Sequence, residues 1–394
     1  MLSNRQLFLA NQAQTTNFPV MLEIEKAEGV YLYGTDGKKY LDFISGISVS
    51  SLGHNNEAVK NAIKNQVDKY MHLMVYGEYI QEPTALLAAK LTSYLPSNLD
   101  CVYFVNSGAE ATDGALKLAK RVTKKTKIIA CKNAYHGSTH AALSLNNSEY
   151  YTQAYRPLLP DVHFIEFNNI ESLNIIDEKT ACVIIETIQG EAGYIVPTYE
   201  FLKALENKCK ENCALLIFDE IQAGIGKTGK MFAFEHWGIE PDILLLGKAL
   251  GAGMPIGAFV SSKKMMHLFA DNPILGHITT FGGHPVIAAA ALAGLNELER
   301  LNILVEVNEK EILIRKLLIH PKIKEIRGKG LMLTAQLTTF EETLKLCQLC
   351  IADGLIIDWF LYANNAIRIV PPLIITKKEI EIAVAIILKN LDLI

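Results

Sequence analysis

Five short apolar runs, which alternate with stretches of helical pattern, restrict the fold of this chain more than any other feature. The runs are CVYFV (101–105), KIIAC (127–131), ACVIIE (181–186), ALLIFD (214–219) and DILLLG (242–247). Strands that are apolar on both faces are typical of a parallel sheet, because the crossover helices cover both of its sides. The sequence therefore predicts a large α/β domain with a mostly parallel sheet covered by helices.

The pattern changes toward the C-terminus. A long helical stretch (PVIAAAALAGLNELERLNI) leads into two strand-like runs, GLMLTAQL and AIRIVPPLII, with another helical stretch between them. Near the N-terminus, two β-rich runs flank the turn GTDG and predict a hairpin. We predict an N-terminal segment (1–53) that packs with the small domain, a large domain (54–290) and a smaller α+β C-terminal domain (291–394).

Charge and composition argue against several classes of protein. The net charge of −4 does not favour nucleic acid as a partner, and no apolar run reaches the ~18 residues that span a membrane. The first residues lack the features of a secretory signal. The 7 cysteines are irregularly spaced, without a second Cys or His pair for zinc. We therefore expect reduced thiols, no metal site and a cytoplasmic location.

Residues that can carry chemistry gather at the ends of three predicted strands. Ser107 and Gly108 stand between a strand and a helix, and a helix N-terminus suits an anion such as phosphate. Asp219 and Glu220 end a second strand, where a carboxylate is costly unless it is paired. Lys248 follows a third strand among glycines, and a buried lysine loses its proton readily and attacks carbonyl carbons. These positions share one edge of a parallel sheet.

Each signal also has an ordinary alternative. A Ser-Gly pair before a helix is often only a cap, and a loop lysine is often a surface residue. The paired carboxylates also suit magnesium, although no GxxxxGK[ST] motif accompanies them. Two further loops are candidates: NAYHGSTHAAL (133–143) offers an aromatic platform for a flat ligand, and GHITTFGGHP (276–285) looks like a second anion cradle.

Together these stretches resemble the class III pyridoxal-phosphate aminotransferases of fold type I. The matching stretches, in order, are YLDFISGISVSSLGH, NSGAEA, YHG, IIETIQGEAG, FDEIQAGIGKTG, LLGKALGAGMPIGA, TTFGGHP, IRGKGLM and IRIVPPL. They run through nearly the whole chain and look closest to the acetylornithine and ornithine aminotransferase branch. The resemblance implies pyridoxal 5'-phosphate as cofactor and a homodimer with shared active sites.

The resemblance also implies a role for each matching position. Lys248 would hold the cofactor as a Schiff base and move a proton, Asp219 would pair with the pyridinium nitrogen, and Glu186 would lie near the lysine. The remaining cofactor-binding positions are Ser107, Gly108 and Ala109 for the phosphate, Tyr135 for the ring face, His136, Gln222 for the phenolic oxygen, and Thr280 for the phosphate of the partner subunit.

Three positions concern the substrate. Arg368, before PPL, would bind an α-carboxylate, and Glu191 would mask it when an ω-amine reacts. The branch usually has an arginine after His-Gly, which binds a second carboxylate, but this chain has Ser138. A serine has neither the charge nor the fork of a guanidinium. Arg156 is a candidate substitute or a surface residue.

The resemblance thus implies an aminotransferase that moves the ω-amino group of an N-acylornithine or ornithine-like donor to a 2-oxoacid, with acetylornithine and 2-oxoglutarate as the leading pair. Ser138 keeps open an ω-amino-acid aminotransferase that acts on GABA, β-alanine or a diamine with pyruvate or 2-oxoglutarate. An amino-acid racemase or mutase is the alternative of another type. A binding protein without activity is disfavoured because Lys248 and Asp219 are both present.

Overall fold

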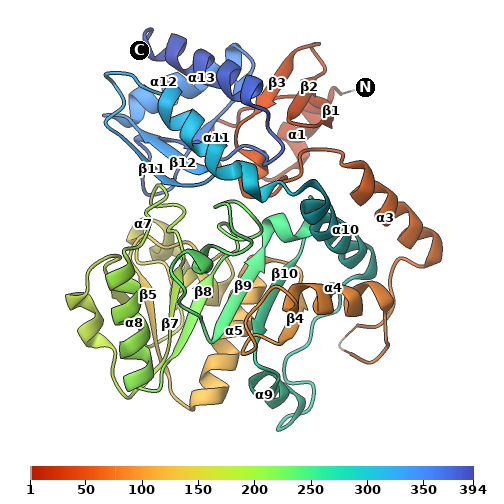
Figure 1. The fold of residues 1–394 in the computed structure, drawn as a ribbon, viewed down its shortest axis with the longest axis vertical. Coiled ribbons are helices and arrows are strands. Elements are labelled where there is room, and N and C mark those ends of the chain that lie inside the picture. Colours follow the sequence, from red (N-terminus) through yellow and green to blue (C-terminus); the bar gives the residue numbers. More distant parts are fainter. Residues whose placement is uncertain (1, 76) are drawn as a thin grey trace.

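The computed structural model describes residues 2–75 and 77–394, and its largest sheet forms the lower body in Figure 1. The order of its strands is β4-β10-β9-β8-β7-β5-β6. They are β4 (Cys101–Val105), β5 (Lys127–Cys131), β6 (Val162–Ile165), β7 (Thr180–Glu186), β8 (Leu215–Asp219), β9 (Ile243–Gly247) and β10 (Gly257–Ser261). β10 runs antiparallel to both of its neighbours, and the rest are parallel. The predicted mostly parallel sheet is confirmed.

Helices cover both faces of this sheet, as the apolar runs predict. On β8, Leu216 and Phe218 belong to the same core cluster as Phe201 of helix α8 (Tyr199–Glu211). The alternate residues Leu215 and Ile217 pack in a second cluster with helix α5 (Gly108–Thr123). Successive side chains of a strand point to opposite faces, so a strand between two helical layers is apolar throughout.

Two strands of the sheet were not predicted. β6 is an edge strand with partly exposed residues, so its sequence VHFI lacks the continuous apolar pattern. β10 begins at a glycine, which reads as part of the preceding loop. That glycine is required by a close approach, because a Cβ at Gly257 would lie 2.0 Å from the carbonyl oxygen of Ser107.

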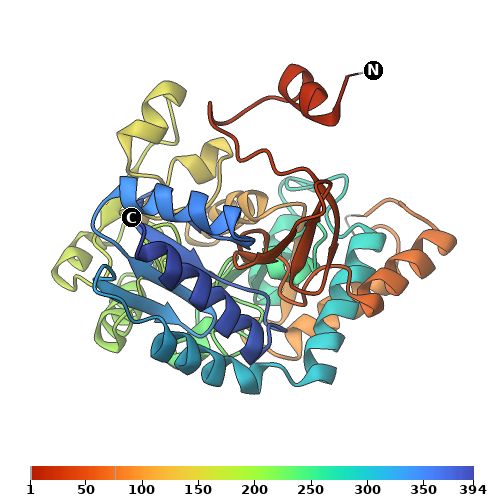
Figure 2. The same ribbon diagram turned by 90° about the horizontal axis from the view of Figure 1, so that it is seen from above.

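Two smaller sheets form the upper body (Figure 1). Their strands are β1 (Ile24–Glu28), β2 (Tyr31–Gly34), β3 (Lys39–Asp42) and β13 (Leu355–Ile356) in one, and β11 (Glu325–Lys329), β12 (Met332–Gln336), β15 (Ala366–Ile369) and β14 (Asp358–Trp359) in the other. The predicted N-terminal hairpin is β2–β3, and β3 pairs with β13 from near the C-terminus. Figure 2 shows this hairpin beside the C-terminal helices. The division of the chain at residues 53 and 290 stays a prediction.

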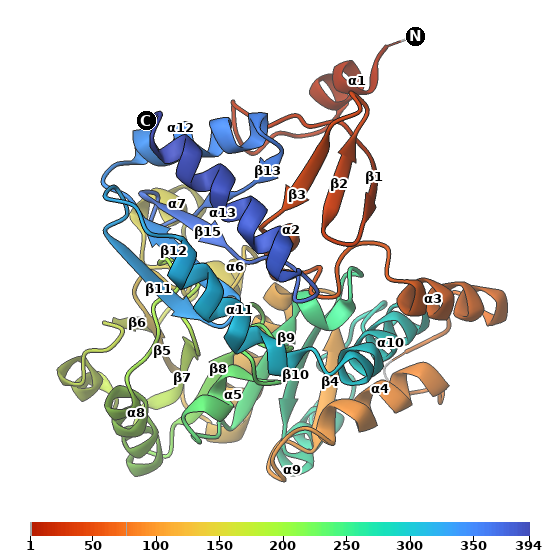
Figure 3. The same ribbon diagram turned by 45° about the horizontal axis from the view of Figure 1, so that its top comes forward.

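The remaining helices connect and cover these sheets. They are α1 (Asn4–Asn11), α2 (Ser45–Ser48), α3 (Glu57–Lys69), α4 (Glu82–Thr92), α6 (His140–Leu143), α7 (Glu149–Thr152), α9 (Lys263–Met266), α10 (Pro285–Leu301), α11 (Leu304–Leu317), α12 (Phe340–Ala352) and α13 (Lys377–Leu391). Figure 3 shows α1 standing away from the rest of the chain. None of the helices in the described ranges is long and apolar enough to cross a bilayer.

Candidate active site

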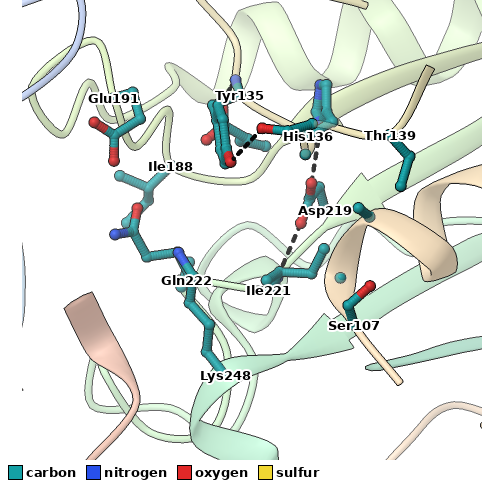
Figure 4. A pocket seen from close by; sticks show the side chains of 16 residues that line it. Ser107, Tyr135, His136, Thr139, Ile188, Glu191, Asp219, Ile221, Gln222 and Lys248 are labelled. Atoms are coloured by element: carbon teal, nitrogen blue, oxygen red, sulfur yellow. Dashed lines mark hydrogen bonds and ion pairs between the residues drawn. The ribbon is translucent and has the colours of Figure 1, made fainter. Parts of the chain in front are cut away.

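Neighbouring strands bring the predicted residues to one edge of the large sheet. Glu186, the last residue of β7, pairs in register with Asp219, the last residue of β8. Lys248 directly follows β9. Gly257 of β10 pairs with both β9 and β4, so the loop at Ser107 and the one at Lys248 lie on either side of β10. The parallel strands therefore end around one space, as Figure 4 shows.

This space is a cavity of about 530 Å³. The predicted residues that line it are Ser107, Gly108, Ala109, Tyr135, His136, Ser138, Glu186, Glu191, Asp219, Gln222 and Lys248. Sequence reasoning missed Gly137, Thr139, Ile188, Ile221 and Ala223 as further lining residues. The apolar residues among them cannot be told from core residues by their sequence pattern. They could be found only because they stand next to the motif residues that line the cavity.

Two predicted residues lie outside this lining. Arg368 is buried on β15, and its guanidinium is hydrogen-bonded to the cavity residue Glu191. Thr280 is exposed in the loop before α10. The candidate substitute Arg156 is also exposed and forms an ion pair with Glu149.

One end of the cavity is the start of helix α5. Ser107 caps the helix, and its Oγ accepts a hydrogen bond from the N–H of Glu110 at 3.2 Å. Gly108 follows, where a Cβ would lie 2.8 Å from Cδ1 of Ile221. The glycine therefore lets the helix start approach the strand-end loop closely. A capped start of a 16-residue helix at the sheet edge is suited to a phosphate group.

Gly137, in the loop that carries Tyr135, packs closely against this helix start. Its φ is +130°, and a Cβ there would lie 2.5 Å from Cβ and 2.8 Å from Cα of Ala109. We expect Gly137→Ala to push the loop off the helix, weaken cofactor binding about tenfold or more, and destabilise the fold by roughly 1–3 kcal/mol. Cofactor titration and thermal unfolding would measure both effects.

Gly238→Ala is the matched control, because Gly238 also has positive φ (+62°) but nothing lies within 4 Å of its built Cβ. This variant should carry a smaller backbone strain, because +62° lies in the left-handed region that alanine can adopt, and it should keep the affinity for the cofactor. Equal affinity losses in the two variants would show that strain, and not the contact with Ala109, explains the result.

Two groups of the protein orient the carboxylate of Asp219. Its Oδ2 is 2.7 Å from Nδ1 of His136, and its Oδ1 accepts from the N–H of Ile221 at 2.9 Å. Burial lowers the pKa of His136, but the hydrogen bond to Asp219 raises it, and the net shift is upward. A buried carboxylate that is oriented in this way can pair with a cationic ring nitrogen in the cavity.

Lys248 and Glu186 both have shifted pKa values because the protein surrounds them. Burial lowers the pKa of Lys248, although the carboxylates of Glu191, Asp219 and Glu186 act in the opposite direction. Burial also raises the pKa of Glu186 to about 7. The Glu186 carboxyl accepts from the N–H groups of Gly190 and Tyr135. The shift of Lys248 favours the neutral amine, which is the nucleophilic form.

Gln222 and Tyr135 complete the walls. In the described part of the chain, Nε2 of Gln222 is buried without a hydrogen-bond partner, so a donor is available to an oxygen of a bound group. Tyr135 is 37 % exposed, and its hydroxyl lies 3.2 Å from that of Ser138. An unpaired amide donor, an aromatic ring, a carboxylate, a helix start and a lysine around one cavity fit pyridoxal phosphate.

Arg368 and Glu191 form a buried ion pair at the edge of this cavity. Nη2 of Arg368 donates to both carboxylate oxygens of Glu191 at 3.0 Å. Glu191 also accepts from the N–H of Leu361 at 3.1 Å. The structure therefore brings the two predicted substrate residues together, with the glutamate between the cavity and the arginine.

The fold and this site define a pyridoxal-phosphate-dependent transaminase. The chain belongs to the class-III aminotransferase family, whose pattern matches residues 11–391. Pyridoxal 5'-phosphate is the cofactor of this family.

Named relatives and solved structures agree with this membership. The chain is 39 % identical over 379 residues to an acetylornithine aminotransferase of Bacillus subtilis, covering 92 % of this chain and 93 % of the relative. It is 40 % identical over 317 residues to a [LysW]-aminoadipate semialdehyde/glutamate semialdehyde transaminase of Sulfolobus acidocaldarius, covering 79 % and 81 %. The ornithine aminotransferase structure from Toxoplasma gondii superposes with a TM-score of 0.91 at 29 % identity, covering 99 % and 94 %.

Proposed function

We propose that this aminotransferase moves the ω-amino group of N-acetylornithine, or a similar N-acylornithine, to a 2-oxoacid, with 2-oxoglutarate as the leading acceptor. The observation that carries the proposal is the arrangement of Lys248, Asp219 and the start of α5 around one cavity, with a masked arginine at its edge. Several relatives of this chain bear the name acetylornithine aminotransferase.

Pyridoxal phosphate, when bound, supplies an electron sink for the reacting carbon of the substrate. Lys248 Nζ would hold its aldehyde carbon and, once the donor amine has replaced it there, would move the proton at the amino-bearing carbon of the donor as a free amine. Asp219 would pair with the ring nitrogen and Gln222 Nε2 with the phenolic oxygen. Ser107, with the N–H groups at the start of α5, would bind the phosphate.

The remaining site residues shape the cavity around the ring. Tyr135 would cover one ring face, and His136 would orient Asp219 through its 2.7 Å contact. Glu186 would hold a proton near Lys248, since its pKa is close to 7.

The masked arginine supports an ω-amine as the reacting end of the donor. With Glu191 on Arg368, none of the described residues that line the cavity offers a free guanidinium. An incoming 2-oxoacid carries a carboxylate there, so Glu191 would have to leave Arg368 before the acceptor binds bidentately. One site would thus serve two substrates in turn.

Ser138 bears on the choice of acceptor. Lys248 and His136 are the basic side chains among the residues that line the cavity, and Ser138 offers only a hydroxyl. Among the described lining residues, a dicarboxylate such as 2-oxoglutarate would therefore meet no guanidinium at its distal carboxylate. This feature favours pyruvate as an alternative acceptor, or an ω-amino acid or diamine as an alternative donor.

We expect Ser138→Arg to lower the KM for 2-oxoglutarate about tenfold, because a guanidinium can pair with its distal carboxylate. The KM for pyruvate should change little, since pyruvate lacks that group. Steady-state kinetics with each oxoacid measures the effect. Ser138→Gln, which adds length without charge, is the control; an equal improvement there, or none with arginine, would contradict this explanation.

We also propose a homodimer in which Thr280 reaches the cofactor phosphate of the partner subunit. Phe281 follows Thr280 and is 53 % exposed, and Ile80, which lines a pocket with Thr279 and Gly282, is 98 % exposed. A second copy of the chain would remove this apolar surface from water. We propose the cytoplasm as its location, in keeping with 7 free cysteines.

Half-reactions test the proposed substrates. The loaded enzyme is mixed with acetylornithine, succinylornithine, ornithine, GABA, β-alanine or diaminobutyrate, and the absorbance of the bound cofactor is followed. The aminated enzyme is then mixed with 2-oxoglutarate or pyruvate. Fastest reaction with the two N-acylornithines supports the proposal. Interconversion of a substrate without net amine transfer would instead identify a racemase or mutase.

A further inference from the structure

Arg368 contacts a second carboxylate besides Glu191. Its Nε lies 3.2 Å from Oδ1 of Asp358, an ion-pair contact without the alignment of a hydrogen bond. Nη2 also donates to the carbonyl oxygen of Trp359 at 3.1 Å, and the ring of Phe360 lies 4.7 Å from Cζ. The guanidinium is thus bordered by two acidic side chains from different parts of the chain.

The two carboxylates are held in different ways. Glu191 lies in a loop after β7 and lines the cavity, so its side chain is within reach of a molecule bound there. Asp358 is on β14, directly across from Arg368 in the β14–β15 pairing. The backbone of the sheet therefore keeps Asp358 next to Arg368 whether or not Glu191 is in place.

The local charge is unbalanced, with one cation between two carboxylates. Burial raises the pKa of Asp358 to about 6, although the Arg368 charge opposes this rise, and Glu191 and Asp42 add to it. Asp358 is therefore mostly ionised at pH 7.5. Its side chain is 28 % exposed, so water screens its effect only in part.

We propose that Asp358 is a specificity-determining residue: a permanent counter-ion of Arg368 that weakens its hold on any substrate carboxylate. An anion that replaces Glu191 meets a guanidinium that is already half neutralised, and it is repelled by Asp358 across it. The site is thereby biased toward donors whose reacting carbon bears no carboxylate. The inference rests on the proposed role of Arg368 in binding such a group.

The effect is measurable only when Glu191 no longer competes. Removing the charge of Asp358 strengthens the pairing of Arg368 with Glu191 as well as with a ligand, so the two gains largely cancel in the native background. Four proteins are therefore compared at pH 7.5: the native enzyme, Asp358→Asn, Glu191→Gln and the double variant. Asparagine retains the shape and one acceptor oxygen.

The readouts are inhibition by propionate, a carboxylate with no group that can react, and the KM for pyruvate. In the Glu191→Gln background, Asp358→Asn should lower the Ki of propionate and the KM for pyruvate about tenfold. The change should appear in KM and Ki rather than in kcat. Alone, Asp358→Asn should change the Ki less than about threefold.

Two controls distinguish a failure of the Asp358 proposal from a failure of the proposed role of Arg368. Asp242→Asn, placed in the same Glu191→Gln background, changes a partly buried aspartate that accepts from the N–H of Leu216 away from the site, and it should leave the Ki unchanged; an equal change there overturns the proposal. An unchanged or raised Ki in the double variant relative to Glu191→Gln also overturns it, with the proposed function intact. If Arg368→Gln leaves the Ki unchanged, the carboxylate role of Arg368 itself is wrong, and both proposals fall.

Discussion

Lys248→Ala should lower the rate of amine transfer at least about a thousandfold, or roughly 4 kcal/mol of activation free energy. The amine of Lys248 lies in the cavity wall, and burial lowers its pKa. Alanine removes both the nucleophile and the group that moves the proton. Rapid-mixing measurement of the donor half-reaction, with enzyme loaded with pyridoxal phosphate, gives the rate of this step.

Two comparisons make the result specific. Lys264→Ala removes an exposed lysine of α9 and should leave the rate within about twofold of native. A small primary amine added to the Lys248→Ala enzyme should restore part of the rate, because the missing group is itself an amine. If Lys248→Ala retained turnover within tenfold of native, the assigned role would be wrong.

Asp219→Asn should reduce the same rate about a hundred- to a thousandfold, or roughly 3–4 kcal/mol. Asparagine matches the aspartate in shape but carries no negative charge to balance a cationic ring nitrogen. It also changes the contact with Nδ1 of His136, at present 2.7 Å, from charged to neutral. The loss should appear in kcat, because the charge matters most when electrons move into the ring.

Asp219→Glu retains the negative charge but moves it by one methylene group. Its rate in the donor half-reaction should lie between the rates of the native enzyme and of Asp219→Asn. An added primary amine should not rescue Asp219→Asn, in contrast to Lys248→Ala. Far-ultraviolet circular dichroism and a cofactor titration would show whether each variant folds and binds pyridoxal phosphate. Native kcat in folded, loaded Asp219→Asn would rule out the proposed pairing.

The large sheet shows how far a sequence pattern extends into structure. All five apolar runs form strands, and β7, β8 and β9 in the middle of the sheet are buried at every position because helices cover both faces. β10 was not predicted because the need for a glycine at Gly257 comes from a distant residue. The carbonyl oxygen of Ser107, 150 residues away in sequence, would lie 2.0 Å from a Cβ there. A pattern of local periodicity does not contain such a contact.

The candidate site also contains residues that could be predicted from the sequence and residues that could not. Ser107, Asp219 and Lys248 were identifiable because each is a polar residue at the end of an apolar run, and parallel strands bring such ends to one edge. Ile188 and Ile221, which also line the cavity, were not identifiable because apolar residues near strand ends are usually core. Thr280 is exposed and outside this lining, so its predicted role depends on a partner subunit.

The sequence by itself determined the class of this protein, since its motifs and the order of its strands and helices both specify a transaminase of this family. Only the tertiary structure decided what surrounds Arg368. Glu191 and Asp358 are 167 residues apart, yet both contact one guanidinium, because the loop after β7 meets the β14–β15 pair there. Charge interactions depend on distance in space, so this second counter-ion could not be read from its place in the chain.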